Sequence, residues 1–203
     1  MKKITLAITL AAIGLASTNV MADDGPWLVR ARIVDVDPAN KSNPVGGVGA
    51  SDLITVSKKV IPEIDISYFF TPNWSTELIL TYPQKHDVYL SGTQIGTVKE
   101  LPPTLTVQYH FMPAEQISPY LGAGVNYTNY SNVDIANGAI TLDSGSFGYA
   151  FQGGVDYKLN KNWSLNFDVK YVEMRSNVYA GGSTISNIQI SPWLIGVGAG
   201  YRF

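Results

Sequence analysis

Two segments decide the fold of this chain: residues 193–203, which read WLIGVGAGYRF, and residues 163–171, which read WSLNFDVKY. In both segments apolar or aromatic residues occupy every second position. In the second segment, Trp163, Leu165, Phe167, Val169 and Tyr171 alternate with Ser164, Asn166, Asp168 and Lys170. Successive side chains of a β-strand point to opposite faces of its sheet, so this alternation predicts strands with two unlike faces.

The same alternation recurs along the rest of the chain, with more noise in its first half. It is found in residues 27–33, 64–70, 78–82, 104–111, 120–127 and 148–157. Helical spacing of apolar residues is hard to find between these segments. The sequence therefore predicts an all-β fold with eight antiparallel strands.

The composition excludes several classes of protein. The chain has 203 residues, of which 45% are hydrophobic, 11% aromatic and 15% charged, with 14 basic against 16 acidic side chains. Such a chain is not disordered, and without a basic excess it is not expected to bind nucleic acid. Because it has no cysteine, disulfide frameworks and thiolate metal sites are excluded as well.

The first 22 residues have the features of a secretory signal peptide. Lys2 and Lys3 precede an apolar run over residues 4–15, and Val20 and Ala22 occupy the small-residue positions before a cleavage point. A membrane anchor is the alternative, but the run is shorter than the roughly 18 residues that a spanning helix needs. We therefore expect a signal peptide over residues 1–22 and one β-barrel domain over residues 23–203.

The connections between the predicted strands alternate in length. Short, turn-rich connections fall at residues 71–73, 112–118 and 160–162, and long polar or glycine-rich ones at residues 38–59, 83–103, 131–146 and 175–187. This predicts an up-and-down meander with short turns at one end and long loops at the other. An even number of antiparallel strands can close on itself, and strands of about 9 to 11 residues tilted near 45° match a bilayer.

Alternation alone does not show which face of such a barrel points outward. A lipocalin-like soluble barrel would enclose its apolar face around a ligand, whereas an outer-membrane barrel would turn that face to lipid. The aromatic residues favour the membrane barrel, because they form two groups at the depth of the headgroups. One group lies beside the short turns (Tyr109, Phe111, Tyr157, Trp163, Tyr201 and Phe203) and the other toward the long loops (Tyr82, Tyr127, Tyr149, Tyr171 and Trp193).

Several segments resemble the OmpW family of Gram-negative outer-membrane proteins, in the same order along the whole mature chain. They are residues 101–105 (LPPTL), 119–127 (PYLGAGVNY), 153–157 (GGVDY), 168–171 (DVKY) and 192–193 (PW). The resemblance implies an eight-stranded transmembrane β-barrel in the outer membrane, with short periplasmic turns and long extracellular loops, that admits small hydrophobic molecules. Residues 38–59 and 83–103 depart most from the family pattern.

The last strand resembles the terminal strand of Gram-negative outer-membrane barrels. It ends on Phe203 and has apolar residues at every second position before it. The resemblance implies that Tyr201 and Phe203 belong to the insertion signal that the outer-membrane assembly machinery reads.

The inward faces of the predicted strands are polar in the periplasmic half of the barrel. The charged and titratable residues assigned to this lumen are Arg30, Arg32, Glu63, Asp65, Glu77, His110, Asp156, Asp168, Lys170 and Arg202. Charges inside so narrow a barrel are tolerated only when they pair, because an unpaired buried ion costs several kcal/mol. We therefore expect a polar plug rather than a continuous water channel.

The inward residues of the extracellular half are apolar instead. They are Val34, Val36, Ile61, Ile79, Val172 and Leu194, and they predict a hydrophobic pocket open to the outside. Prolines lie at the same end of the strands, at Pro62, Pro83, Pro102, Pro103 and Pro192. A missing N–H removes ladder hydrogen bonds, so these prolines indicate a lateral opening; the alternative is that they merely end strands and blunt loops.

Three functional classes are consistent with this pattern. The first is a conduit for small hydrophobic solutes that releases them into the membrane lipid, and the second is a structural or receptor barrel for phage, toxin or surface binding. The third is an enzyme, suggested only by His86, Asp87 and Ser91 in one long loop, which a solvated loop explains better. We expect no enzyme, no cofactor and no metal site, and a monomer in the outer membrane.

Overall fold

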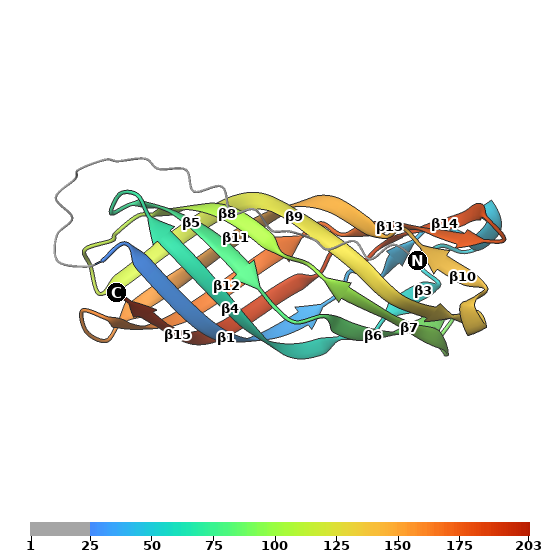
Figure 1. The fold of residues 1–203 in the computed structure, drawn as a ribbon, viewed down its shortest axis with the longest axis horizontal. Helices are drawn as coiled ribbons and strands as arrows, with labels where there is room; N and C mark the ends of the chain where they lie inside the picture. Colours follow the sequence, from blue (N-terminus) through green and yellow to red (C-terminus); the bar gives the residue numbers. More distant parts are fainter. Residues whose placement is uncertain (1–24) are drawn as a thin grey trace, which may run out of the picture.

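The computed structural model describes residues 25–203, so the predicted signal peptide and the boundary at residue 23 lie outside the described residues. Eight antiparallel strands form a closed barrel, in which each strand pairs with the next along the chain and the last pairs with the first (Figure 1). They are β1 (Trp27–Asp37), β4 (Lys59–Phe69), β5 (Trp74–Leu80), β8 (Thr104–His110), β9 (Ile117–Ile135), β11 (Gly145–Lys158), β12 (Trp163–Val172) and β15 (Trp193–Arg202). This confirms the predicted fold class.

Seven further strands and two 3-10 helices extend the barrel at the end far from the C-terminus, where the sequence predicted loops (Figure 1). The strands are β2 (Lys41–Ser42), β3 (Ile54–Val56), β6 (Gln84–Leu90), β7 (Thr93–Leu101), β10 (Ile140–Leu142), β13 (Arg175–Ala180) and β14 (Ser183–Gln189), and the helices are η1 (Val45–Gly47) and η2 (Ala136–Gly138). The hairpins β6–β7 and β13–β14 carry much of this extension. We call it the extracellular extension.

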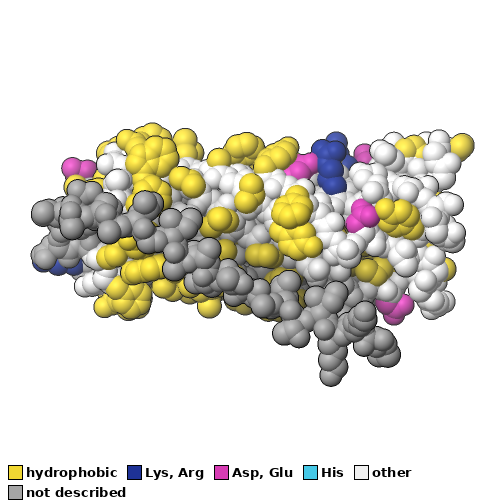
Figure 2. All heavy atoms as spheres, turned by 45° about the horizontal axis from the view of Figure 1, so that its top comes forward, with side chains coloured by type: hydrophobic (Ala, Val, Ile, Leu, Met, Phe, Trp, Pro, Cys, Tyr) yellow, Lys and Arg dark blue, Asp and Glu magenta, His cyan; other side chains and the backbone are white. Residues whose placement is uncertain are grey.

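The barrel turns its apolar face outward. Along β12 the side chains of Leu165 and Phe167 are about half exposed, whereas Asn166 and Asp168, which alternate with them, are buried. In water this arrangement would leave apolar side chains exposed to solvent, which is unfavourable. In lipid the same arrangement is favourable. Figure 2 shows hydrophobic side chains spread over the barrel part of the visible face. The membrane barrel is therefore correct and the lipocalin-like alternative is wrong.

Aromatic side chains form two belts on the outer surface. Near the short turns Trp163 packs edge-on against Tyr201, with ring centroids 5.0 Å apart. Toward the extension Tyr171 packs against Trp193 with centroids 5.4 Å apart. Amphipathic rings prefer the headgroup depth, so the two belts mark the edges of the bilayer. None of the helices in residues 25–203 has the length and apolar character needed to cross a membrane.

Glycines of β15 let two arginines lie flat against the inner wall. A Cβ atom at Gly196 would lie 3.3 Å from Arg32 Cδ, and one at Gly200 would lie 3.1 Å from Arg30 Cγ. At Gly198 a Cβ would lie only 2.0 Å from the carbonyl oxygen of Ala31, because β1 and β15 approach closely. The small residues of the last strand thus make room for the side chains that β1 sends into the lumen.

Candidate functional site

A network of ion pairs crosses the lumen, centred on two arginines of β1. Arg30 Nη2 lies 2.7 Å from Asp156 Oδ2, and its Nη1 lies 3.3 Å from Asp65 Oδ1. Arg32 Nη1 lies 2.9 Å from both Glu63 Oε1 and Asp65 Oδ2. All five side chains are buried. Because β1, β4 and β11 contribute them, the network joins opposite walls of the barrel.

Further residues complete this network from β5, β9 and β12. Glu77 Oε1 lies 3.2 Å from Arg32 Nη2. Lys170 Nζ lies 3.3 Å from Glu63 Oε1 and 3.8 Å from Asp168 Oδ1. The hydroxyl of Tyr120 donates to Asp168 Oδ2 at 2.8 Å. Eight of the ten residues assigned to the plug by sequence are therefore in one ion-pair network.

The other two predicted plug residues lie at the periplasmic mouth. His110 Nε2 is 3.2 Å from the hydroxyl oxygen of Ser75, and its ring packs between Phe69 and Tyr120, with centroid distances of 4.8 and 5.2 Å. Arg202 donates from Nε to the carbonyl oxygen of Gly25 at 2.8 Å, and its guanidinium lies over Phe69, 4.1 Å from the ring centroid. These two residues line the periplasmic mouth.

Sequence reasoning missed Tyr120 as a member of the plug. Tyr120 is buried. Its hydroxyl donates to Asp168 and accepts a hydrogen bond from the side-chain amide of Asn166 at 3.1 Å. The signal was available, because Tyr120 has the same parity as the inward Gly122 and Asn126 of the same strand. Tyr120 was assigned neither to an aromatic belt nor to the lumen, although alternation along its strand turns it inward.

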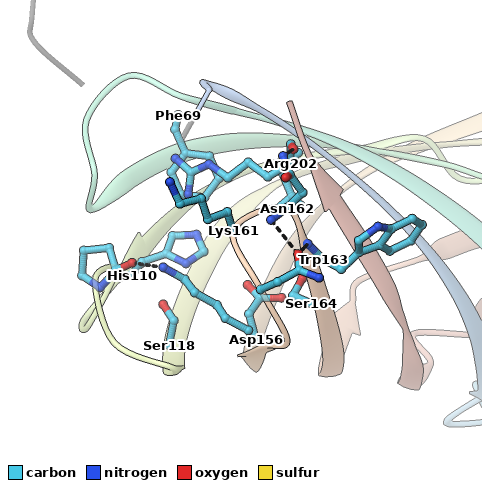
Figure 3. A pocket seen from close by; sticks show the side chains of 13 residues that line it. Phe69, His110, Ser118, Asp156, Lys161, Asn162, Trp163, Ser164 and Arg202 are labelled. Carbon is cyan, nitrogen blue, oxygen red and sulfur yellow. Dashed lines mark hydrogen bonds between the residues drawn. The ribbon is translucent and has the colours of Figure 1, made fainter. Parts of the chain in front are cut away.

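A small pocket opens at the periplasmic mouth, below the network (Figure 3). It lies among the ends of β8, β11, β12 and β15, and Asp156 and His110 are on its wall while Arg202 reaches over Phe69. Because Asp156 is held by Arg30, the pocket ends at the ion pairs. Its lining does not overlap with that of the cavity at the other end.

The extracellular extension forms a cavity that is lined only by valine, isoleucine and leucine. The lining residues come from η1, β3, β6, β7, β9, β10, β13, β14 and the residue that follows β14: Val45, Ile54, Val56, Val88, Leu90, Ile95, Val98, Ile135, Ile140, Leu142, Val178, Ile185, Ile188 and Ile190. No polar atom contributes to its exposed lining. The cavity therefore offers dispersion contacts and no hydrogen bonds.

The residues that the sequence assigned to a pocket lie on the barrel strands, between this cavity and the plug. Val34, Val36, Ile61, Val172 and Leu194 are buried and belong to the same continuous apolar cluster as the lining residues. Ile79 is buried on β5 outside that cluster. None of the six lines the cavity itself. The lining residues were missed because their segments were expected to be loops.

The wall of the barrel is interrupted on one side, where four of the five prolines gather. Pairing of β5 with β8 ends at Ile79 and Thr104, and pairing of β6 with β7 begins at Gln84 and Glu100, so residues 80–83 and 101–103 are not paired with each other. Pro83, Pro102 and Pro103 lie in these two unpaired stretches, and Pro62 lies on β4 beyond its last pairing with β5. We call this the wall break.

The fifth proline lies at a closed seam. The carbonyl oxygen of Pro192 accepts a hydrogen bond from the backbone N–H of Val172 at 3.2 Å, and Ile190 N–H donates to the carbonyl of Met174 at 3.0 Å. Backbone hydrogen bonds thus continue between β12 and β15 into the hairpin β13–β14. The sequence assigned Pro192 to a lateral opening, but the backbone pairing beside it is not interrupted.

The three residues that suggested an enzyme do not form a catalytic arrangement. His86 is buried and faces the lumen, where Nδ1 lies 2.8 Å from the carbonyl oxygen of Ser57. Asp87 points the other way and accepts a hydrogen bond from Gln94. Ser91 lies at the exposed tip of the β6–β7 hairpin. Within residues 25–203 no group of three or more histidine or carboxylate side chains is arranged to hold a metal ion.

Comparison with known proteins agrees with this architecture. The family model described as OmpW family matches residues 23–203. The chain belongs to the OmpW family. The outer-membrane protein y4mB of Sinorhizobium fredii is 40% identical over 203 residues, which cover 97% of this chain and 88% of that protein.

A solved structure and a more distant relative extend the comparison. The crystal structure of the outer membrane protein OprG from Pseudomonas aeruginosa is 27% identical, with a TM-score of 0.78, and the match covers 89% of this chain and 97% of that one. The dibenzothiophene metabolism operon protein PahQ of Pseudomonas aeruginosa is 25% identical over the whole of both chains. This OmpW-family chain is therefore a Gram-negative outer-membrane barrel.

Proposed function

We propose that this barrel is a passive channel for small hydrophobic molecules, which enter the apolar cavity from outside and leave sideways into the outer membrane. The observation that carries the proposal is the pairing of an entirely apolar cavity with a closed ionic plug beneath it. A solute that enters would gain roughly 25 cal/mol for each Å² of apolar surface it buries. It would gain nothing by moving on into the plug.

The plug makes the direct route to the periplasm unfavourable for such a solute. To pass Arg32 an apolar molecule would have to separate it from Glu63, Asp65 and Glu77 in a low-dielectric interior. Removing one partner from a buried ion pair costs about 3–5 kcal/mol, and several pairs would have to open together. A path sideways through the wall avoids this cost.

The wall break supports the sideways path. Between Ile79 and Gln84 on one side, and between Glu100 and Thr104 on the other, no backbone ladder joins the two segments. Prolines on both sides cannot donate to close it. The outer leaflet is apolar just beyond, so release there keeps the solute in a favourable medium.

The name of one relative fits the same solute class. PahQ is named for an operon of dibenzothiophene metabolism, and dibenzothiophene is an apolar aromatic molecule. The solute class that we propose for this chain is broader than one aromatic molecule. The cavity lining selects for apolar surface and offers no hydrogen bond that would distinguish one hydrocarbon from another.

Uptake into vesicles tests the proposal. Val98 lines the cavity and is almost fully buried, so Val98→Asp places a charge among the apolar side chains. We expect uptake of an alkane such as n-octane to fall by at least about tenfold, since an isolated buried charge or its hydration opposes entry. Val48→Asp, on the exposed surface of the same extension, is the matched control. Unchanged uptake in a correctly folded Val98→Asp barrel would favour a receptor barrel instead.

A further inference from the structure

We propose that Gln84, His86 and Glu100 form a polar subsite at the inner end of the apolar cavity, which accepts hydrogen bonds from the hydroxyl or ammonium head of an amphiphilic solute. This inference rests on the proposed function and narrows its substrate class. The favoured solute has an apolar tail for the cavity and a hydrogen-bond donor at one end. A plain hydrocarbon would use only part of the site.

The three residues are not part of the apolar lining of the cavity but lie next to it, on the side of the wall break. Gln84 and Glu100 face each other across the β6–β7 hairpin at its first pairing, and His86 faces Val98 two residues farther out. All three polar side chains are buried, so they share the inward face of the hairpin. Val98 lines the cavity above them, and residues 80–83 and 101–103, which are not paired with each other, begin directly below them.

Two buried atoms of this cluster lack a hydrogen-bond partner. Gln84 and Glu100 expose only 2% and 3% of their surface, yet Gln84 Oε1 and Glu100 Oε2 accept no hydrogen bond. A buried polar atom left unpaired costs about 1–3 kcal/mol, more for a charged group. Both atoms are acceptors. The group that satisfies them must therefore be a donor, which is what a hydroxyl or an ammonium supplies.

His86 fixes the carboxylate in this orientation. Its Nδ1 lies 2.8 Å from the carbonyl oxygen of Ser57, which can only accept, so Nδ1 carries a hydrogen. Its Nε2 lies 3.3 Å from Glu100 Oε1, so a proton is also shared between these two atoms. His86 thus occupies one oxygen of Glu100 and leaves Oε2 free.

The other groups that face this pair do not satisfy the free oxygen. The hydroxyl of Tyr130 on β9, which is paired with Glu100 in register, donates to the carbonyl oxygen of Arg175 at 3.4 Å. Lys59 at the start of β4 acts on His86 through its charge. A solute with a carboxylate head would meet two acceptor oxygens and be excluded. The arrangement therefore selects donor heads against both anionic and apolar ones.

Histidine NMR offers a direct test, because the chain has only two histidines and His110 lies at the far mouth as an internal reference. The barrel, labelled with 15N-histidine and held in lipid nanodiscs, is titrated with 1-octanol, n-octylamine, octanoate and n-octane. We expect 1-octanol or n-octylamine to move the His86 resonances and to leave those of His110 in place. The probe that moves the His86 resonances identifies the preferred head group. Octanoate and n-octane should leave the resonances of both histidines in place.

Two variants make the test specific. Glu100→Gln should weaken apparent binding of the active probe by at least about tenfold, the effect of losing one charge-assisted hydrogen bond. Gln84→Leu removes the other acceptor and should weaken binding as well, and it guards against a Glu100→Gln barrel that fails to fold. Glu115→Gln, in an exposed turn at the opposite end, is the matched control. A response to n-octane equal to that of the active probe would show no preference for a donor head, and no response to either 1-octanol or n-octylamine would show a site filled by water alone; each result would overturn the subsite.

The subsite and the channel can fail separately. If vesicles take up n-octane and 1-octanol equally well, and Glu100→Gln changes neither rate, the channel stands and the subsite is wrong. If 1-octanol binds at His86 but neither probe crosses into the lipid, the subsite stands and the proposed channel is wrong.

Discussion

Single residues determine whether the charged interior of this barrel is stable. Arg30 is completely buried and still charged, and it is tolerated because Asp156 and Asp65 surround its guanidinium. Parity along the strands was enough to place both carboxylates inside, since each follows the inward pattern of its own segment. The partners could not be derived from sequence. Residues 30 and 156 lie 126 positions apart, and only the closed barrel brings them together.

Replacing Arg30 tests the plug directly. Arg30→Ala would leave Asp156 buried without its main partner and would take one of its two arginines from Asp65, so we expect the free energy of unfolding to fall by about 3–5 kcal/mol. Urea unfolding in lipid vesicles measures this change. The control is Lys58→Ala, which breaks an ion pair with Asp37 on the exposed surface and should have little effect. Equal losses in the two variants would mean that the plug is not a stabilising network.

The buried His86 gives the extracellular extension a pH dependence. Burial lowers the pKa of this imidazole, but the hydrogen bond and charge of Glu100 outweigh burial, and the pKa lies above its usual value. Because the folded pKa is raised, the pair stabilises the extension fully below the ordinary histidine pKa of about 6.5, and this contribution is lost as the pH rises through the folded value. We expect amide hydrogen exchange in β6 and β7, corrected for its intrinsic pH dependence, to lose protection over that range. In Glu100→Gln this step should disappear, and its persistence would assign it to another group.

The strands show where sequence patterns suffice and where they fail. For β12 and β15 the predicted ranges agree with the structure to within one residue, because lipid on one side and a polar lumen on the other enforce strict alternation. In contrast, β6, β7, β13 and β14 were expected to be loops. Outside the membrane their outer face meets water, and the inner face of β6 carries Gln84 and His86 as well as Val88, so the inner face is not uniformly apolar. The alternation that marks a strand is therefore weak in them, and the cavity they build was not predicted.

Crosslinking across the wall break tests its role in release. The chain has no cysteine, so Tyr82→Cys with Leu101→Cys can be joined by a cleavable bis-maleimide reagent without side reactions. We expect the joined barrel to lose most of its uptake of n-octane and to regain it when the linker is cut. The control joins Thr76→Cys to Val107→Cys, which face each other where β5 and β8 are paired. Similar losses from both linkers would remove the wall break from the pathway.

The whole molecule is a closed cylinder, and its closure should be visible on a gel. Because β15 pairs with β1, the eight membrane strands leave no free edge at which unfolding could begin. We expect an unheated sample in dodecyl sulfate to stay folded and to migrate differently from a boiled one. Trp27→Ala combined with Trp163→Ala, which removes two rings of the periplasmic belt, should lower the temperature of this transition. A single position for heated and unheated samples would contradict the closed barrel.

One strand passes through the full height of the molecule. β9 runs from Ile117 to Ile135 with one bulge at Asn132, so the backbone that carries Tyr120 into the plug also carries Ile135 into the cavity wall. Its partners β8 and β11 hold its lower part, and β7 and β10 hold its upper part. A strand that is paired along both edges resists bending. We therefore expect the extracellular extension to deform away from β9, at the wall break with its prolines. A solute that enters the cavity would then widen the wall break, while the ion-pair network beneath the cavity keeps its shape.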